Sequence, residues 1–412
     1  MKSLKELYRV GKGPSSSHTM GPQRAAKMFL DRCSNAALYE VTLYGSLAAT
    51  GKGHMTDVAI EEVLQPHHSV NIIWKPQVFL PYHPNGMKFV GKDVNGDIID
   101  EWTVYSIGGG ALADGTEGTQ ELGAEDVYDL NSLAEIQTWC YDHGRTFWEY
   151  VEKCESSDIW DFLDMIWQTM KRSVRNGLDH EGALPGPLNL TRKAATYYTK
   201  AKGYRASLQS RGLVYAYALA VSEENASGGV IVTAPTCGAC GVLPAVLYHL
   251  HTAHEMSEQR ILRALATAGL IGNIVKHNAS ISGADVGCQG EVGVACAMAS
   301  AAACQLFGGS PAQIEYAAEM GLEHHLGMTC DPVCGLVQIP CIERNAFAAA
   351  RALDADLYAS FSDGHHSVSF DRVVEVMRQT GHDLPSLYKE TSEGGLAKGF
   401  GKQMNYPLEL YV

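Results

Sequence analysis

The chain reads Asn278-Ala-Ser-Ile-Ser-Gly-Ala-Asp-Val-Gly-Cys288-Gln-Gly-Glu-Val-Gly293 before an alanine-rich run, and Gly327-Met-Thr-Cys330-Asp-Pro-Val-Cys334-Gly-Leu-Val-Gln-Ile-Pro-Cys341-Ile-Glu-Arg344 after it. Cys288, Cys330 and Cys341 lie among glycines, prolines and polar residues, where turns let sulfur atoms from distant chain positions converge on a metal. A single buried cysteine is more often a small apolar residue, and that interpretation suits Cys296 and Cys304 inside the alanine-rich run. The stretch therefore predicts packed helices joined by polar loops that carry a thiolate site.

The spacing of the close cysteine pairs leaves the kind of thiolate site open. Cys237 and Cys240 form a C-x-x-C pair, but Cys330 and Cys334 are separated by three residues, which is not zinc-ribbon spacing. A thioredoxin-like role needs a βαβ context, and the closely spaced cysteines of a ferredoxin are missing. Spacing alone predicts a thiolate-rich site with an undefined number of metal ions.

Composition narrows the class of protein. The 412 residues are enough for two or three domains, and a net charge of −14 gives no electrostatic footprint for nucleic acid or for an anionic membrane. No apolar run is long enough to span a bilayer, and Met1 to Tyr8 carries charges where a signal peptide needs apolar residues. An odd number of cysteines, eleven, without an export signal favours the reducing cytoplasm.

The hydrophobic pattern divides the chain into three regions. Residues 1–130 read as an α+β domain, whose clearest element is a hairpin around Asn95-Gly96 in Lys88–Trp102. Residues 131–190 read as a helical connection, and residues 191–412 as an all-α domain. The helical runs expected there are Arg192–Tyr198, Arg211–Ser222, Ser257–Leu270, Val294–Leu306, Ala312–Glu323 and Asn345–Leu353.

A polar loop, Gly13–Pro22, precedes the first predicted helix, Gln23–Arg32, and is called the serine loop below. It reads Gly13-Pro-Ser15-Ser16-Ser17-His18-Thr19-Met-Gly-Pro22. Ser17 or Thr19 is expected to cap the helix, whose N-terminus is suited to an anion. From the local pattern alone, a simple capping turn explains the loop equally well.

Several long motifs resemble one family over almost the whole chain. They are the serine loop above, Gly51-Lys-Gly-His54-Met-Thr-Asp57, Leu80-Pro-Tyr-His83-Pro-Asn85-Gly-Met87, Tyr105-Ser-Ile-Gly-Gly-Gly110, Thr233-Ala-Pro-Thr-Cys-Gly-Ala239, Gly287-Cys-Gln-Gly-Glu-Val-Gly293, and the segment from Cys330 to Asn345. They look like the motifs of iron–sulfur L-serine dehydratases (L-serine ammonia-lyases), and the resemblance continues to Gly395.

The resemblance implies a 4Fe–4S cluster held by Cys288, Cys330 and Cys341, with one iron open to substrate. It also implies an N-terminal domain similar to the allosteric substrate-binding domain of some phosphoglycerate dehydrogenases, an all-α catalytic domain and a homodimer. Cys237, Cys240 and Cys334 fall where the family has no ligand. Family members often end in a tail with a terminal cysteine that reaches the active site. Residues 396–412 contain none, so substrate activation is expected to lack a lag.

Removal of water from serine needs a base at Cα and a Lewis acid for the departing hydroxide. His18 is expected to be the base, because imidazole titrates near neutral pH. The expected substrate-binding residues are Ser15, Ser16, Ser17, Thr19, His83, Asn85, Thr236, Cys237 and Gly238. For His83 and Asn85 a turn between strands is an equal alternative, and His54 with Asp57 is either an orienting pair or the start of a helix.

Three other functions stay open at this point. An L-cysteine desulfidase would use the same cluster to release sulfide. A pyridoxal-phosphate dehydratase would need a phosphate loop and a Schiff-base lysine, for which Gly108 to Gly110 alone is thin support, so no pyridoxal phosphate is expected. A non-enzymatic iron–sulfur sensor would explain the cysteines but not the serine–histidine loop.

Overall fold

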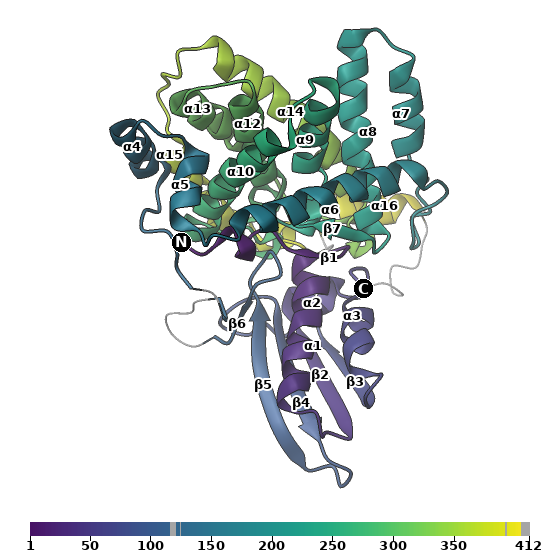
Figure 1. The fold of residues 1–412 in the computed structure, drawn as a ribbon. Helices are drawn as coiled ribbons and strands as arrows, with labels where there is room; N and C mark the ends of the chain where they lie inside the picture. The colour runs from purple at the N-terminus through teal and green to yellow at the C-terminus, as the bar shows by residue number, and fades with distance from the viewer. Residues whose placement is uncertain (116–120, 124, 392–393, 405–412) are drawn as a thin grey trace.

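The computed structural model describes residues 1–115, 121–123, 125–391 and 394–404. A mixed β-sheet with its helices lies at one end of the molecule, and a larger helical part lies at the other (Figure 1). The N-terminus lies at the junction between the two parts. A mixed-sheet region followed by a helical region is the architecture that the sequence predicts.

The sheet has the strand order β3-β2-β4-β5-β6, and only the β2–β3 pair is parallel. Its strands are β2 (Leu38–Tyr44), β3 (Ser69–Lys75), β4 (Gly86–Lys92), β5 (Ile98–Ser106) and β6 (Leu112–Ala113). Helices α1 (Gly21–Arg32), α2 (Gly45–Thr50) and α3 (Thr56–Leu64) accompany it. Phe29 of α1 packs against Tyr39 and Phe89 of the sheet, so the apolar stripe of an amphipathic helix closes a core of its own.

The predicted hairpin is confirmed, with a wider turn than a two-residue loop. β4 and β5 are antiparallel, and Lys92 lies opposite Ile98. The Asp93 carboxylate accepts hydrogen bonds from the backbone N–H groups of Asn95 and Asp97. Gly96 has a φ of 91°, a conformation that favours glycine.

The predicted cap of the first helix is wrong. No side chain caps α1, because its chain enters directly from a preceding helical turn, Ser16–Met20. Ser15 caps that turn: its Oγ accepts the His18 backbone N–H at 3.0 Å. The capping residue is therefore Ser15, two residues before Ser17 and four before Thr19.

The helical part contains most of the predicted runs as longer helices. Their bounds are α4 (Leu133–His143), α5 (Phe147–Cys154), α6 (Ile159–Asp179), α7 (Ala194–Lys202), α8 (Ala206–Ala226), α9 (Val242–Ala253), α10 (Glu258–Asn278), α11 (Gly283–Val286), α12 (Val292–Leu306), α13 (Pro311–Glu323), α14 (Cys341–Phe361), α15 (Phe370–Asp383) and α16 (Gly395–Met404). The runs predicted from the sequence did not include α9 or α15.

Helix α12 is the centre of the helical part. It contacts α9, α10, α13 and α14, and almost every residue in it is buried. Its alanines and its glycine, Gly293, let neighbouring helices approach closely, and a helix that is apolar all round is expected to be buried. Cys296 and Cys304 are buried within it, which confirms that they are core residues.

The opening segment belongs to the junction. Strand β1 (Val10–Lys12) pairs with β7 (Val230–Val232), and Leu4, Leu7 and Tyr8 are buried in the core of the helical part. The division of the chain at residues 130 and 190 stays a prediction, and this packing indicates that the first residues accompany the helical part. None of the helices in the described part of the chain has the length and apolar character needed to cross a membrane.

Candidate functional site

Three loops of the helical part bring the predicted metal-binding cysteines to the junction. Cys288 begins a short turn before α12, Cys330 follows α13, and Cys341 is the first residue of α14. The Sγ atoms of Cys288 and Cys330 and a carboxylate oxygen of Glu291 lie within 4.8 Å of one another. Cys341 lies outside that tight group but is buried and interacts electrostatically with Cys288.

Burial and the neighbouring cysteine disfavour ionisation of the thiols of Cys330 and Cys341. The hydrogen bond with Cys288, followed by burial, raises the pKa of the Cys330 thiol, and burial with the charge of Cys288 raises the pKa of Cys341. Burial alone would lower the pKa of Arg344, but the nearby thiols of Cys288 and Cys341 outweigh it and raise the pKa. Convergent thiols that repel one another as thiolates are a donor set suited to a metal centre, since a bound cation removes that repulsion. The residues therefore fit a metal or iron–sulfur group.

The serine loop places His18 in the same junction. The His18 side chain is fully buried, and its Nδ1 lies 2.9 Å from Ser17 Oγ and 3.5 Å from Glu390 Oε1. Its Nε2 lies 3.4 Å from Ser46 Oγ. Burial lowers the pKa of His18 to about 4, partly opposed by a backbone hydrogen bond with Ser46. His18 is therefore a neutral imidazole near neutral pH. Contrary to the expectation from the sequence, it does not titrate there, because burial disfavours the charged ring.

The hydrogen-bond network assigns the His18 tautomer. Ser46 Oγ donates its proton to the Glu390 carbonyl at 3.0 Å, so toward His18 it can only accept. This places the ring proton on Nε2 and leaves the lone pair on Nδ1. The lone pair of His18 faces Ser17 and the Glu390 carboxylate.

His54 lies against His18, with ring centroids 4.6 Å apart. Its Nδ1 bonds Thr50 Oγ1 at 3.1 Å, and its buried Nε2 has no hydrogen-bond partner within the described residues. Asp57 starts α3 and its carboxylate accepts the Val58 backbone N–H. Of the two alternatives for Asp57, the helix start is the one observed.

The other predicted substrate-binding residues of the serine loop are all buried. Ser15 Oγ and Thr19 Oγ1 are engaged with the backbone of His18 and of His54, the latter at 2.6 Å. Ser16 hydrogen-bonds the Cys237 thiol. The loop is thus a rigid support for His18, with Ser17 beside its lone pair.

The Thr236–Gly238 loop reaches the cysteines through Glu291. Thr236 Oγ1 donates to Glu291 Oε1 at 2.8 Å, and an added Cβ on Gly238 would lie 3.0 Å from the same oxygen. Cys237 Sγ instead contacts Met20 Sδ at 3.4 Å. Thr236 and Gly238 therefore line the carboxylate of Glu291, and Cys237 faces the serine loop.

His83 and Asn85 come from the loop before β4. His83 Nδ1 accepts the Asn85 backbone N–H at 3.1 Å, which is the turn that the sequence allowed as an alternative. Asn85 is also buried, and its Oδ1 has no partner among the residues described. Burial lowers the pKa of His83 to about 4. Repulsion from the charged form of His83 also contributes to the lowered pKa of His18, so the two rings lie near one another.

Cys334 belongs to a different environment. It has a φ of 57° in the turn Val333–Gly335 and packs in a small apolar cluster with Leu188 and Phe400. Nothing in the described region groups it with the three cysteines above.

Sequence reasoning missed two buried carboxylates. Glu291 Oε2 lies 3.8 Å from Cys288 Sγ and 4.0 Å from Cys330 Sγ, and burial raises the pKa of Glu291 to about 8. Burial also raises the pKa of Glu390 to about 8. The three-residue spacing between Cys288 and Glu291, about one helical turn, was a usable signal. Glu390 begins the stretch Glu390-Thr-Ser-Glu-Gly-Gly395 at which the family resemblance ends, but no spacing ties it to the site, because it reaches His18 only through the tertiary fold.

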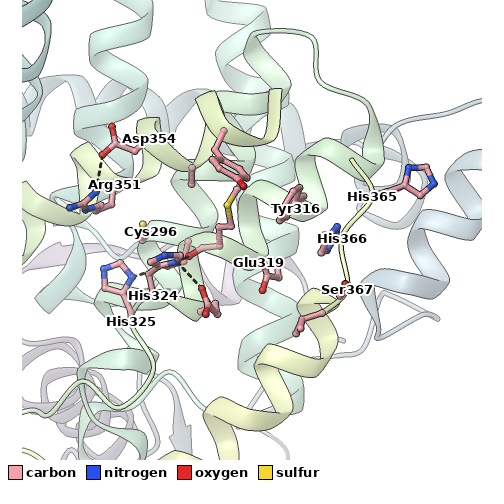
Figure 2. Close-up of a pocket in the computed structure, with 16 residues that line it drawn as sticks. Cys296, Tyr316, Glu319, His324, His325, Arg351, Asp354, His365, His366 and Ser367 are labelled. Carbon is pink, nitrogen blue, oxygen red and sulfur yellow. Dashed lines mark hydrogen bonds and ion pairs between the residues drawn. The ribbon is translucent and has the colours of Figure 1, made fainter. Parts of the chain in front are cut away.

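A separate cavity of about 750 Å³ opens on the helical part between α13, α14 and the loop at His365–Val368. Figure 2 shows that Tyr316, Glu319 and His366 face it from one side and Arg351 and Asp354 from the other. None of the predicted site residues lines it. The chemistry-bearing residues therefore gather at the junction and not in this cavity.

Buried thiols, a buried neutral histidine and buried carboxyl groups lie close together at the junction. Such an arrangement is typical of an enzyme active site. The family model described as "Serine dehydratase alpha chain" matches residues 58–397, and "Serine dehydratase beta chain" matches residues 3–69. The chain is 41% identical to L-serine dehydratase 1 of Escherichia coli, with 96% of this chain and 99% of that protein covered. It is 40% identical to L-serine dehydratase of Streptomyces coelicolor, with coverage of 96% and 98%. The chain belongs to the serine dehydratase family.

Proposed function

We propose that the protein eliminates water from L-serine and releases pyruvate and ammonia. The observation that supports it most directly is that Glu390 lies beside His18 and pairs by its backbone with Cys330, which is grouped with Cys288. Cys341 is buried near Cys288. Relatives of about 40% identity that bear the name L-serine dehydratase support the same substrate. The aminoacrylate product tautomerises and hydrolyses without further catalysis.

The proposal includes a 4Fe–4S cluster with Cys288, Cys330 and Cys341 as its ligands. When bound, such a cluster supplies a Lewis acid for the departing hydroxyl, because three cysteine ligands leave one iron open. The buried donor set at the junction fits this group. Cys334, which packs elsewhere, is not part of the ligand set.

His18 is the proposed base for the Cα proton. Burial keeps its imidazole neutral, and the Nε2 proton directed at Ser46 leaves Nδ1 as the accepting atom. Once Nδ1 is protonated, the Glu390 carboxyl group 3.5 Å away and the Ser17 hydroxyl are its nearest polar neighbours. The serine loop holds the ring by its backbone, so the base needs little reorganisation.

The remaining substrate contacts are proposed from the free polar atoms. Asn85 Oδ1 has no partner in the described structure and is a candidate acceptor for a substrate N–H or O–H group. The Ser16 hydroxyl and the backbone of Thr236–Gly238 are candidate donors to the substrate carboxylate. The Ser17 hydroxyl donates to His18 Nδ1 in the free site and would become a further donor when substrate displaces that hydrogen bond. Ser15, Thr19, His83 and Cys237 complete the proposed wall of the site.

Three further features that the family resemblance implies are also proposed for this chain. The N-terminal sheet region would resemble the allosteric substrate-binding domain of phosphoglycerate dehydrogenases. The protein would act as a homodimer in the cytoplasm, where its thiols stay reduced.

The test is pyruvate release from L-serine by anaerobically prepared protein, repeated on the same sample after exposure to air. We expect activity that is lost in air together with the visible absorbance of the cluster. Cys341→Ser should abolish both signals, whereas Cys334→Ser, a matched thiol outside the ligand set, should keep both.

Each other outcome points to a different enzyme. Activity that is indifferent to air, with both cysteine variants fully active, would contradict the cluster and return pyridoxal phosphate to consideration. A cluster-loaded sample without activity on L-serine but with sulfide release from L-cysteine would identify a desulfidase. A cluster that is intact in a protein inactive on both amino acids would favour a sensor.

A further inference from the structure

Glu390 is fixed in the site by the backbone of two distant regions. Its N–H donates to the Cys330 carbonyl at 2.8 Å, and the Cys330 N–H donates to the Tyr388 carbonyl at 2.8 Å. Its own carbonyl accepts from Ser46 Oγ of α2 at 3.0 Å. Glu390 also has a φ of 58°, an uncommon conformation for a residue with a side chain. Hydrogen bonds from two distant regions and an uncommon backbone conformation therefore fix the position of the Glu390 side chain.

The carboxylate of Glu390 is only partly used by the protein. Glu390 is 6% exposed, and its Oε1 lies 3.5 Å from His18 Nδ1. Its Oε2 is buried and finds no hydrogen-bond partner in the part of the chain described. Among the same residues the ion pairs give it no lysine or arginine. A buried carboxylate in such a position is costly unless a cation or donor joins it.

Glu291, the neighbouring acid, faces the predicted ligand cysteines. Thr236 donates to its Oε1, and its Oε2 lies within 4.0 Å of the Sγ atoms of Cys288 and Cys330. Glu390 instead lies beside His18 Nδ1, the proposed proton acceptor, and keeps a buried oxygen without a partner in the described residues.

We propose that Glu390 binds the α-ammonium group of the substrate and thereby restricts the site to amino acids. The inference rests on the proposed function, in which the substrate is L-serine. With no cation beside it in the described residues, the buried Glu390 carboxyl group favours its neutral form in the free site. A substrate ammonium group supplies the charge that stabilises the carboxylate, and its charge-assisted hydrogen bond finds Oε2 free. Cα is one bond from that nitrogen, so an ammonium group on Glu390 also brings the Cα proton toward His18 Nδ1.

The experiment compares L-serine with 3-hydroxypropionate, which keeps the hydroxyl and carboxylate but has no ammonium group. Glu390→Gln removes the charge with little change of shape. In the cluster-loaded variant we expect the KM for L-serine to rise at least tenfold. The inhibition constant of 3-hydroxypropionate should stay within twofold of wild type. Glu390→Asp keeps the charge and should lose less affinity for L-serine than Glu390→Gln.

Glu319→Gln is the matched control. Glu319 is a buried carboxylate, 5% exposed, in the separate cavity of Figure 2, so its variant should change neither constant. Equal weakening of both ligands in Glu390→Gln, or no change in either, would overturn the proposal. Should wild type fail to act on L-serine, the proposed function fails. Calorimetric titration of the two ligands, which needs no turnover, would then still decide the role of Glu390.

Discussion

The buried imidazole of His18 illustrates how single residues set the chemistry of this site. The ring is neutral near neutral pH, because burial lowers its pKa to about 4. Its orientation comes from a side-chain contact at each nitrogen, with Ser17 and with Ser46. A base prepared in this way is neutral and oriented before substrate arrives.

Replacement of His18 by asparagine tests this role. His18→Asn keeps a polar side chain but removes the basic nitrogen, so kcat for L-serine should fall by about 10²–10⁴, with the cluster absorbance unchanged. Steady-state kinetics on anaerobic protein measures the effect. His249→Asn is the control, because His249 is also buried with a pKa lowered to about 4 but lies in the core of the helical part. A kcat for His18→Asn within threefold of the control would exclude His18 as the base.

At the same scale, the site was only partly predictable from the sequence. His18, Cys288, Cys330 and Cys341 lie in long local motifs, and the structure brings His18, Cys288 and Cys330 to one junction, with Cys341 beside them. Their ligand and base roles stay predictions. Glu390 was not predicted, because its approach to His18 depends on a backbone pairing with Cys330, 60 positions earlier in the chain. Residue type and spacing carry no record of such a pairing.

At the scale of elements, the helices that support the site depend on small residues at their crossings. Helix α6 packs closely on α8 where Gly177 meets Ala220, and a Cβ added to Gly177 would lie 2.7 Å from Ala220 Cα. That distance is below van der Waals contact, and the obstacle is backbone, which cannot rotate away. The two helices would have to separate.

Gly177→Ala should therefore destabilise the protein by about 1–3 kcal/mol, although alanine favours a helix more than glycine does. Thermal or denaturant unfolding at neutral pH measures the change. Gly203→Ala adds the same methyl group at the end of α7, where the nearest atom would be 3.4 Å away, and should be nearly neutral. Equal stability of the two variants would show that the α6–α8 crossing tolerates a larger spacing.

Periodicity predicted most elements because they are long and strongly patterned. The helical runs near residues 257–270 and 294–306 and the hairpin at Asn95-Gly96 were found by their own sequence. The short strands β1 and β7 were not, because three residues each carry too little pattern and their pairing joins positions far apart. Helix α9 was not predicted because it lies in a largely apolar segment, where the spacing of apolar residues does not distinguish a helix from a strand.

At the scale of the whole molecule, a buried ion cluster joins the sheet part to the helical part. Glu121 is 6% exposed and pairs with Arg9 of the opening segment and with Lys276 of α10, whose Nζ lies 2.7 Å from Glu121 Oε2. Arg9 also donates to the Gly109 carbonyl at 2.6 Å. These contacts join the N-terminal segment, the end of the sheet and the helical part beside the site.

Burial alone would raise the pKa of the Glu121 carboxyl group, but Lys276 and Arg9 outweigh it and hold the pKa below its ordinary value of 4.5. A lowered pKa in the folded state means that the carboxylate contributes stability above pH 4.5. That contribution is lost as the pH falls through the folded-state pKa. The junction is therefore weakened by acid.

Glu121→Gln should destabilise the protein at pH 7 by about 3 kcal/mol, because it leaves the largely buried Lys276 without its ion-pair partner, while Arg9 keeps its ion pair with Glu6. The deficit relative to wild type should shrink as the pH falls below 4.5, since wild type then loses the same charge. Denaturant unfolding across this pH range measures both effects. Glu62→Gln is the control: Glu62 pairs with Lys12 at 3.4 Å in an exposed position, so its loss should change little. A deficit for Glu121→Gln that stays constant with pH would mean that the side chain acts through packing. The two parts of the molecule would then be held together without this charge.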